Sequence, residues 1–378
     1  MPERDDPNRE FTYIDLTAVD QDAKAITGAR KLPCAEAPSR ARQMVSAGDV
    51  IVSTVRPNLN AVARVPPELD GATASTGFCV LRPRPDRLDS NYLFHWVRSP
   101  RFVGEMVRRA AGASYPAVTD RIVYESRLSL PPLPEQRRIA EILDKADALR
   151  AKRCAGLAQL DALTQSIFLD MFGDPATNPK GWPRKTIGDL ATKISDGPFG
   201  SNLKSEHYTD AGVRVIRLQS IDVGEFLDSD KAYISEQHFA SLEKHECLPG
   251  DVLIGTLGDP NLRACVQPNW LARALNKAAC VQLRPDESIA NAAYLCAILN
   301  CLSTERMAQG LVLGQTQLRI SMGRLRTLEV PVPPIDLQCT FAQRMMSVQV
   351  AKVALQRSLG QLESLFSSLQ HRAFRGEL

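Results

Sequence analysis

The chain has 378 residues, more than a single ordinary hydrophobic core organises, so two or more domains are expected. Hydrophobic residues make up 44% and charged residues 24%, which is typical of a soluble globular protein, and no apolar run reaches the roughly 20 residues of a membrane helix. A net charge of +3 is too small to indicate a nucleic-acid partner, so any such partner has to be inferred from motifs.

The N-terminus and the cysteines both argue against a secreted protein. Residues 1–10 are charged and contain no apolar segment, so no signal peptide is expected. The nine cysteines include no Cys-x-x-Cys pair and are odd in number, so neither a disulfide framework nor a zinc site is indicated. Free thiols suit a reducing compartment, and we expect a cytoplasmic protein without a membrane anchor.

The most informative feature of the sequence is an internal repeat. Gly48-Asp49-Val50 recurs as Gly250-Asp251-Val252, an offset of 202 residues, and Leu81-Arg82-Pro83 recurs as Leu283-Arg284-Pro285 at the same offset. Further pairs at this offset are Ile14 and Ile216, Tyr92 and Tyr294, Gly112 and Gly314, Gln136 and Gln338, and Gln159 and Gln361. A constant offset over more than 140 residues indicates a duplicated unit, with a period far too long for a solenoid.

The first part of each copy is expected to be rich in short strands. β-branched runs such as 213–218 and 251–254 are separated by Gly, Pro, Asn and Asp residues. Helical segments are expected near residues 91–109 and again near residues 291–309. This alternation predicts a compact α+β domain in each copy.

A long helix is expected after each of these domains. Pro131-Pro132 and Pro134 interrupt the preceding segment, and apolar residues then recur at helical spacing with no further proline before Pro175. A helix of about 37 residues is roughly 55 Å long. The second copy follows Pro333-Pro334. Because one small domain cannot bury so long an apolar stripe, we expect the two helices to pair as an antiparallel coiled coil. The alternative is two amphipathic helices, each packed on its own domain.

The head of the first long helix carries the most specific motif. It reads Pro131-Pro132-Leu133-Pro134-Glu135-Gln136 and continues as Arg137-Arg138-Ile139-Ala140-Glu141-Ile142-Leu143, with a degenerate counterpart at 330–338. Further motifs are Trp182 followed by 187–190, the stretch 196–204, and Pro249-Gly250-Asp251-Val252-Leu253. Together these motifs resemble the specificity subunits of Type I restriction-modification systems, and the resemblance covers nearly the whole chain.

The resemblance implies an α+β fold in which two target-recognition domains are joined by two long antiparallel coiled-coil helices. It implies recognition domain 1 at 1–130, spacer helix 1 at 131–173, recognition domain 2 at 174–329 and spacer helix 2 at 330–378. Because the offset aligns Met1 with Leu203, recognition domain 1 lacks a counterpart of 182–202 and is expected to be N-terminally truncated.

The resemblance also implies the partners. Each recognition domain would read one half of a split target in double-stranded DNA. The subunit would recruit methyltransferase subunits, of which two are expected, and restriction subunits. The methyltransferase subunits would transfer a methyl group from S-adenosylmethionine to adenine N6, so that chemistry would lie outside this chain.

Motifs that would carry catalysis are absent from the sequence. There is no glycine loop for S-adenosylmethionine, no Asn/Asp-Pro-Pro-aromatic motif, no GxxxxGK[ST] loop and no HExxH. We therefore expect no catalytic residue, no cofactor and no metal site, which disfavours a fused methyltransferase-specificity enzyme. The other alternative is a non-catalytic coiled-coil scaffold that binds proteins alone.

Candidate DNA contacts are the polar side chains of loops that follow strands. Arginine suits guanine, asparagine and glutamine suit adenine, and lysine, arginine, serine and threonine contact phosphates. In the second domain the candidates are Lys193, Ser201, Asn202, Lys204, Gln219, Ser220, Asn261, Arg263, Asn276, Lys277, Gln315, Thr316, Gln317 and Arg319. In the first domain they are Arg56, Asn58, Ser114 and Tyr115. The segment 314–319 is the strongest candidate because it is polar and begins with glycine.

The segment Asp196-Gly197-Pro198-Phe199-Gly200 has two interpretations. Its backbone N–H groups could cradle a phosphate. It could instead form a tight turn that needs glycine for a positive φ. We expect such a turn, near the face that meets DNA.

Overall fold

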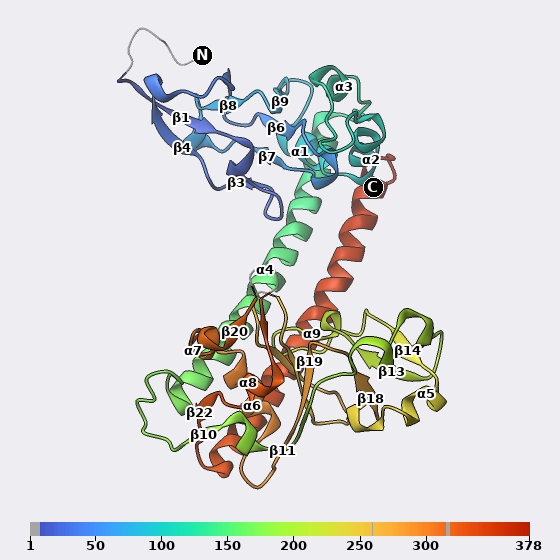
Figure 1. The fold of residues 1–378 in the computed structure, drawn as a ribbon. Helices are drawn as coiled ribbons and strands as arrows, with labels where there is room; N and C mark the ends of the chain where they lie inside the picture. Colours follow the sequence, from blue (N-terminus) through green and yellow to red (C-terminus); the bar gives the residue numbers. More distant parts are fainter. Residues whose placement is uncertain (1–7, 259, 315–317) are drawn as a thin grey trace. The chain divides into compact units, whose positions relative to one another are not determined.

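The computed structural model describes residues 8–258, 260–314 and 318–378. The chain divides into two compact units, one made of Met1–Ala155 with Gln356–Leu378 and the other of Gly156–Leu355. Both units contain part of each of two long helices, α4 (Leu133–Phe172) and α9 (Ile335–Ala373) (Figure 1). The structure mixes helices and sheets, as the sequence predicts.

The first unit is built from two main sheets, a small ribbon and three short helices. Its strands are β1 (Glu10–Ile14), β2 (Val19–Asp20), β3 (Ala25–Ile26), β4 (Arg30–Pro33), β5 (Ala41–Met44), β6 (Val50–Ser53), β7 (Val62–Arg64), β8 (Thr73–Ser75) and β9 (Phe78–Leu81). Its short helices are α1 (Ser90–Val97), α2 (Pro100–Arg109) and α3 (Asp120–Tyr124). The sheet orders are β4-β1-β8-β5, with β1 and β8 parallel, and β7-β6-β9, which is antiparallel throughout.

Strand β6 is buried on both faces, which accounts for its uninterrupted apolar sequence. Alternate side chains of a strand point to opposite faces. Val50 and Val52 accordingly lie in a core with Tyr92 and Trp96 of α1, whereas Ile51 lies in a second apolar cluster on the other face. Helix α1 therefore covers one face of the β7-β6-β9 sheet, and a second layer covers the other.

The second unit repeats this plan with additional strands. These are β10 (Arg184–Thr186), β11 (Ala191–Ser195), β12 (Tyr208–Thr209), β13 (Val213–Ile216), β14 (Ala232–Ile234), β15 (Glu246–Cys247), β16 (Val252–Gly255), β17 (Arg263–Val266), β18 (Ala274–Asn276), β19 (Cys280–Pro285), β20 (Val312–Leu313), β21 (Arg319–Ile320) and β22 (Glu329–Pro331). The short helices are α5 (Glu236–Ala240), α6 (Ala292–Leu299), α7 (Leu302–Ala308) and α8 (Met322–Leu325). The main sheets have the orders β12-β14-β13-β18-β15 and β11-β19-β16-β17.

The 202-residue offset relates the units element by element. It aligns β6 with β16, β9 with β19, α1 with α6 and α2 with α7. Side chains of strand β16 alternate between two apolar clusters, as those of β6 do. Val252 and Ile254 lie in one cluster with Tyr294 of α6, and Leu253 lies in the other. The same offset would put the counterparts of β10 and β11 before residue 1.

An ion pair with a buried carboxylate joins the two most obvious repeated motifs. In the first unit, Asp49 accepts hydrogen bonds from Arg82 at 2.7–3.2 Å, and in the second Asp251 accepts them from Arg284 at 2.9 and 3.0 Å. Both carboxylate side chains are only 2% exposed. The Gly-Asp-Val and Leu-Arg-Pro motifs are therefore two halves of one structural contact between neighbouring strands.

Both long helices contribute to the core of each unit. In the first unit, Phe374, which directly follows α9, lies edge-on to Trp96, with ring centroids 5.3 Å apart, and Phe366 of α9 and Leu143 of α4 join the same core. In the second, Phe172 of α4 and Phe341 of α9 meet at 5.3 Å. The first unit thus uses the start of α4 and the end of α9, and the second uses the opposite ends.

Contacts between the helices fix their direction within each unit. In the first unit, the Nε atom of Arg153 donates to Ser358 Oγ at 3.2 Å, and Arg150 lies over the ring of Phe366 at 4.8 Å. In the second unit, Lys352 pairs with Asp161. Rising residue numbers on α4 meet falling numbers on α9, so the helices are antiparallel inside each unit.

A buried glutamine ties the start of each long helix to its domain. The Gln136 carbonyl oxygen accepts from Asp89 N at 2.9 Å, and its amide nitrogen donates to the carbonyls of Arg87 and Pro131 at 2.9 and 2.8 Å. Gln136 is fully buried, and Asp89 caps helix α1. The first turn of α4 is thereby locked to the first turn of α1.

The second unit repeats the contact atom for atom. Gln338 accepts from Asn291 N at 2.9 Å and donates to the carbonyls of Ile289 and Pro333 at 3.0 and 2.8 Å. Asn291 caps α6 as Asp89 caps α1. We refer to these two contacts as the glutamine clamps.

Removing a clamp should lower stability sharply. Replacing Gln338 by alanine deletes three hydrogen bonds and leaves buried backbone groups unpaired, so we expect the free energy of unfolding to fall by roughly 2–4 kcal/mol. Chemical denaturation of the full chain measures this loss. Gln343→Ala, on an exposed position of the same helix, is the matched control and should change stability little. Equal effects of the two substitutions would contradict the clamp.

Candidate nucleic-acid interface

The same two loops meet at one corner of each unit. In the first unit, Arg56 N donates to Pro116 O at 2.7 Å and Val118 N donates to Thr54 O at 2.8 Å. These bonds join the β6–β7 loop to the loop that follows α2. We call the place where these two loops meet the loop corner.

The second unit has an equivalent loop corner. Gly258 N donates to Leu318 O at 3.2 Å, and Ile320 N donates to Thr256 O at 3.0 Å. Thr256 and its counterpart Thr54 also bond through their hydroxyls to the backbone, at 3.2 and 2.9 Å. The duplication therefore preserves the backbone contacts that hold the corner together.

A third loop, residues 196–200, is anchored beside β18 in the second unit. Asn276 is fully buried, and its amide donates to Ser195 O at 2.9 Å and to Cys280 O at 2.8 Å. His245 donates from Nδ1 to the carbonyl of Asp196, which fixes the tautomer because a carbonyl can only accept. The loop is therefore held by side chains from two separate strand connections.

Gly197 is required by close packing and not by its backbone angle. A Cβ atom at this position would lie 2.1 Å from the carbonyl carbon of Lys277, which leaves no room for any side chain. The positive φ of this loop falls on Gly200, at 59°. The expected turn with a positive φ is thus present at Gly200, while Gly197 permits the contact between the loop and β18.

Cations and aromatic rings share the surface around this loop. Arg319 lies over the ring of Phe199 at 5.3 Å and faces Asp196 at 4.0 Å. Burial raises the pKa of the Asp196 carboxyl, and the nearby Arg319 opposes this shift. Lys277 lies over the ring of Tyr208 at 5.5 Å. Such pairs of cations and aromatic rings offer both charge and stacking surfaces to a nucleic acid.

The loop corner of the first unit also carries a pair of a cation and an aromatic ring. Arg56 lies over the ring of Tyr115 at 4.8 Å, and both side chains are exposed. Arg56 comes from the β6–β7 loop and Tyr115 from the loop after α2, so the pair spans the loop corner. The structure thus brings two of the four candidates of this unit together, while Asn58 and Ser114 are exposed nearby in sequence.

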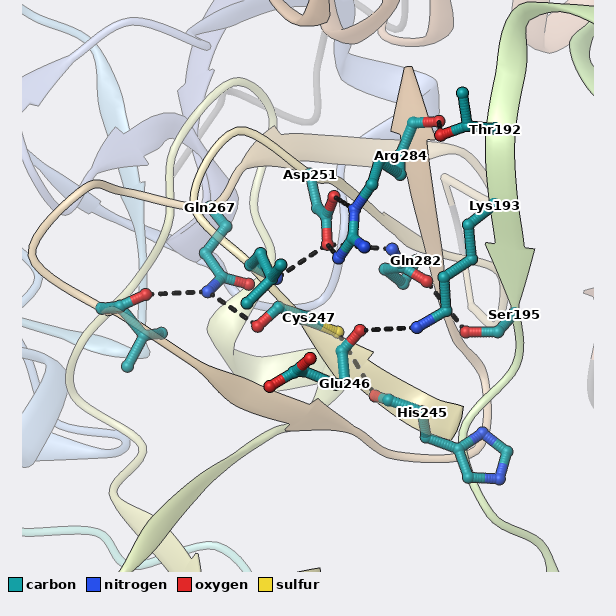
Figure 2. Close-up of polar contacts among 12 residues, drawn as sticks. Thr192, Lys193, Ser195, His245, Glu246, Cys247, Asp251, Gln267, Gln282 and Arg284 are labelled. Carbon is teal, nitrogen blue, oxygen red and sulfur yellow. Dashed lines mark hydrogen bonds and ion pairs between the residues drawn. The ribbon is translucent and has the colours of Figure 1, made fainter. Parts of the chain in front are cut away.

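Figure 2 shows how a second group of polar residues is used inside the second unit. Asp251 accepts from Arg284, from Gln282 at 2.8 Å and from Leu248 N at 2.7 Å. Lys193 turns toward this region, and its Nζ donates to Glu246 O at 3.0 Å. These contacts stabilise the junction of β11, β15, β16 and β19.

The candidate residues of the second unit separate by exposure. Ser201, Asn202, Lys204 and Gln219 are exposed; Lys193, Arg263, Lys277 and Arg319 are half-buried; and Ser220, Asn261 and Asn276 are buried. Gln315, Thr316 and Gln317 lie outside the described residues.

Four candidates have side chains that are buried in the unit or bound to its backbone. Ser220 and Asn276 are 0% exposed and Asn261 is 8% exposed, so none of them presents a side chain to a ligand at the surface. The amine of Lys193 is occupied by a carbonyl inside the unit. Polar residues after strands satisfy backbone groups of the protein as readily as they contact DNA, and the sequence does not distinguish these uses.

Other residues at the interface were not among the candidates. Asp196, Phe199, Tyr208, Arg217 and His245 all contribute to it, and Arg217 both pairs with Asp230 and lies over Tyr208 at 5.9 Å. Phe199 and Asp196 stand in the motif 196–204, which was a usable signal. The roles of Tyr208 and His245 depend on contacts between segments distant in sequence.

Across residues 8–258, 260–314 and 318–378, no three His, Cys, Asp or Glu side chains are grouped so as to hold a metal ion. In that same part of the chain, no helix combines the length and apolar character needed to cross a membrane.

Comparisons with known proteins bear on the identity of the duplicated fold. Residues 46–158 match the family described as the Type I restriction modification DNA specificity domain. The specificity subunit of the Type I restriction enzyme MjaVIII from Methanocaldococcus jannaschii is 18% identical, over 77% of this chain and 71% of that protein. A chain of a solved type I R-M system, studied for its complex assembly and conformational transition, is 27% identical over 98% of this chain and 93% of that chain, with a TM-score of 0.61.

Residues 46–158 thus carry a Type I restriction modification DNA specificity domain, and the chain as a whole is similar to Type I specificity subunits. The S subunit of a Type I restriction-modification system from M. genitalium shares the fold, at 15% identity over 99% of this chain and 91% of that chain, with a TM-score of 0.52. The stretch that matches the specificity-domain family contains both the Asp49–Arg82 pair and the Gln136 clamp. The framework that carries the loop corner of the first unit therefore lies inside the stretch that matches this family.

The anchor of the 196–200 loop should make the stability of the second unit depend on pH. Burial holds the pKa of His245 below its usual 6.5, against a hydrogen bond to Asp196 O that favours the charged form. A lowered pKa means that the neutral form is favoured by folding, so its contribution is complete above pH 6.5 and is lost as pH falls through the folded-state pKa. We expect the wild type to lose more stability between pH 7.5 and 5.5 than His245→Asn, whose amide keeps a donor near Nδ1. Urea unfolding at the two pH values tests this, and parallel losses would contradict it.

Proposed function

We propose that this chain is the DNA sequence-specificity subunit of a Type I restriction-modification complex. The observation that carries the proposal is the duplicated loop corner, which occurs once in each unit of a chain that is similar to Type I specificity subunits. Two copies of one recognition unit suit a DNA target that is split into two halves. The side chains at the two loop corners differ, which suits a target whose two halves have different DNA sequences.

The proposal assigns a role to each segment of the chain. Recognition domain 1 spans 1–130, spacer helix 1 spans 131–173, recognition domain 2 spans 174–329 and spacer helix 2 spans 330–378. The glutamine clamps support this division, because each joins a recognition domain to the first turn of the helix that follows it. The antiparallel contacts within each unit support a coiled-coil spacer.

The chain itself supplies recognition and no chemistry. Exposed lysine, serine and asparagine side chains contact phosphates and fix register, while arginine and amide side chains of the loop corners read base edges. The subunit binds double-stranded DNA and recruits methyltransferase subunits, two in number, together with restriction subunits. Methyl transfer and DNA cleavage take place on those partners.

Single-molecule methylation sequencing tests the proposal directly. DNA is taken from cells that carry this gene with its neighbouring methyltransferase gene, and from cells in which only this gene is deleted. We expect a split adenine-methylated motif that disappears on deletion and returns on complementation. A methylated motif that survives the deletion would contradict the proposal. An assembled complex that binds its protein partners but shows no salt-dependent binding of duplex DNA would contradict it as well.

Two lysines of the second unit should behave differently in DNA binding. Lys204 is exposed, so Lys204→Ala should weaken binding to all sequences and lower the salt slope of log K by about 1. Lys193 is held inside the unit, so Lys193→Ala should leave the slope unchanged and lower stability instead. Binding titrations of the assembled complex from 50 to 200 mM salt, roughly the range in which such contacts are resolved, measure both slopes. Equal slopes for the two variants would contradict these roles.

The length of the long helices should set the gap in the target. Seven residues inserted after Ala155 and seven after Leu355, where one unit ends and the other begins, lengthen both helices together. One heptad adds about 10.5 Å at 1.5 Å per residue, which corresponds to about three base pairs at 3.4 Å each. We expect the methylated motif to keep both halves and to gain about three base pairs between them.

Insertion into one helix only is the control for this design. It breaks the pairing of the two helices and should reduce methylation without defining a new gap. A double insertion that left the gap unchanged would contradict the spacer role of the helices.

A further inference from the structure

Each loop corner contains one arginine that is held over an aromatic ring. In the first unit the pair is Arg56 over Tyr115, and in the second it is Arg319 over Phe199. In both pairs the ring belongs to a different loop from the arginine. Stacking restricts the guanidinium to a plane and leaves its N–H edge directed away from the ring.

The backbone at both arginines is fixed by the loop corner. Arg56 has a φ of 50°, in the left-handed region, and its N–H is held by Pro116 O at 2.7 Å. Arg319 lies in the β20–β21 ribbon opposite Leu313 and forms a bridge with Leu257. Neither arginine depends on a free loop for its position, so both are preorganised.

The guanidinium groups of these two residues make no hydrogen bond to any other side chain or carbonyl in the described part of the chain. In the described part of the chain, nothing accepts a hydrogen bond from the guanidinium of Arg56. The Arg319 guanidinium forms an ion pair with Asp196 at 4.0 Å, beyond hydrogen-bond distance, and its Nε atom is buried without a hydrogen-bond partner in the described part of the chain. By contrast, Arg82, Arg217 and Arg284 are bound to carboxylates.

The duplication does not account for the two arginines. The offset of 202 aligns Arg56 with Gly258 and Arg319 with Ala117. One arginine therefore comes from the first loop of the corner and the other from the second loop. Two unrelated positions have converged on a stacked arginine with free donors at the same corner.

We propose that Arg56 and Arg319 each read one guanine, Arg56 in the half-target of the first unit and Arg319 in the half-target of the second. A guanidinium fork matches the O6 and N7 acceptors of guanine in the major groove, which is the commonest specific contact between proteins and DNA. This inference rests on the proposed function. A phosphate offers similar acceptors, and the experiment below separates the two.

The test uses methylation sequencing with the complete methyltransferase complex. Arg56→Gln and Arg319→Gln should each lower the preference for one guanine roughly ten-fold or more, with adenine gaining at that position because glutamine pairs with adenine. The two variants should affect opposite halves of the motif, and all other positions should keep their preferences. Arg87→Gln and Arg326→Gln, at exposed arginines elsewhere in the two units, are the controls and should leave the motif unchanged.

Other outcomes overturn the inference. A uniform loss of methylation with a salt slope lower by about 1 would assign the arginine to a phosphate. An unchanged motif, or a change in the same half for both variants, would also exclude guanine reading. If Arg319→Gln lowers the melting temperature, Arg319→Lys replaces it in the test, because lysine keeps the positive charge beside Asp196. The Arg319→Lys variant should still prefer guanine at that position of the methylated motif, but less strongly than the wild type. If the wild-type gene itself gives no dependent motif, the proposed function fails and not this assignment alone.

Discussion

The structure depends on a pair of buried side-chain amides. Only an amide can accept one backbone N–H and donate to two carbonyls from a single terminal group, and Gln136 and Gln338 use all three capacities. Glutamate lacks the donors and lysine lacks the acceptor. The clamp converts a flexible proline-rich connection into a rigid joint between a helix and a domain. A domain joined in this way keeps a fixed direction relative to the first turn of the helix that follows it.

The two units keep their interior contacts in common and differ at the surface. The Asp–Arg pair, the threonine that closes the loop corner and the glutamine clamp recur at the same offset. At the corner itself, Arg56 is replaced by Gly258, and Ala117 by Arg319. Packing and hydrogen bonding constrain the interior of both copies in the same way, because the same backbone has to be supported. The solvent-facing positions are free of that constraint and can differ with the sequence each unit reads.

Sequence reasoning identified the duplication, the long helices and the mixed α+β composition, because each of these leaves a periodic or repeated pattern. It also identified Arg319 and Arg56 as polar residues in loops. It did not predict that Asn276 and Ser220 are buried, since a buried polar side chain and an exposed one have the same sequence context. It explained the glycines of the 196–200 loop only in part, because the need for Gly197 arises from Lys277, which is 80 residues away. The aromatic partners of Arg56 and Arg319 could not be predicted either, because a local sequence pattern does not show which segments meet in the fold.

The first unit is assembled from two separate pieces of chain, Met1–Ala155 and Gln356–Leu378, and this has a consequence for recombination between related genes. A single crossover in α4 would combine a first recognition domain from one parent with a closing helix from the other. Phe366 and Phe374 would then have to fill a foreign core. Two crossovers, one in each helix at the boundary between the units, would exchange a recognition unit with its own clamp and its own closing segment. To make hybrid subunits with new pairs of half-targets, the two parent sequences are therefore best joined inside the long helices, away from the proline motifs that precede them.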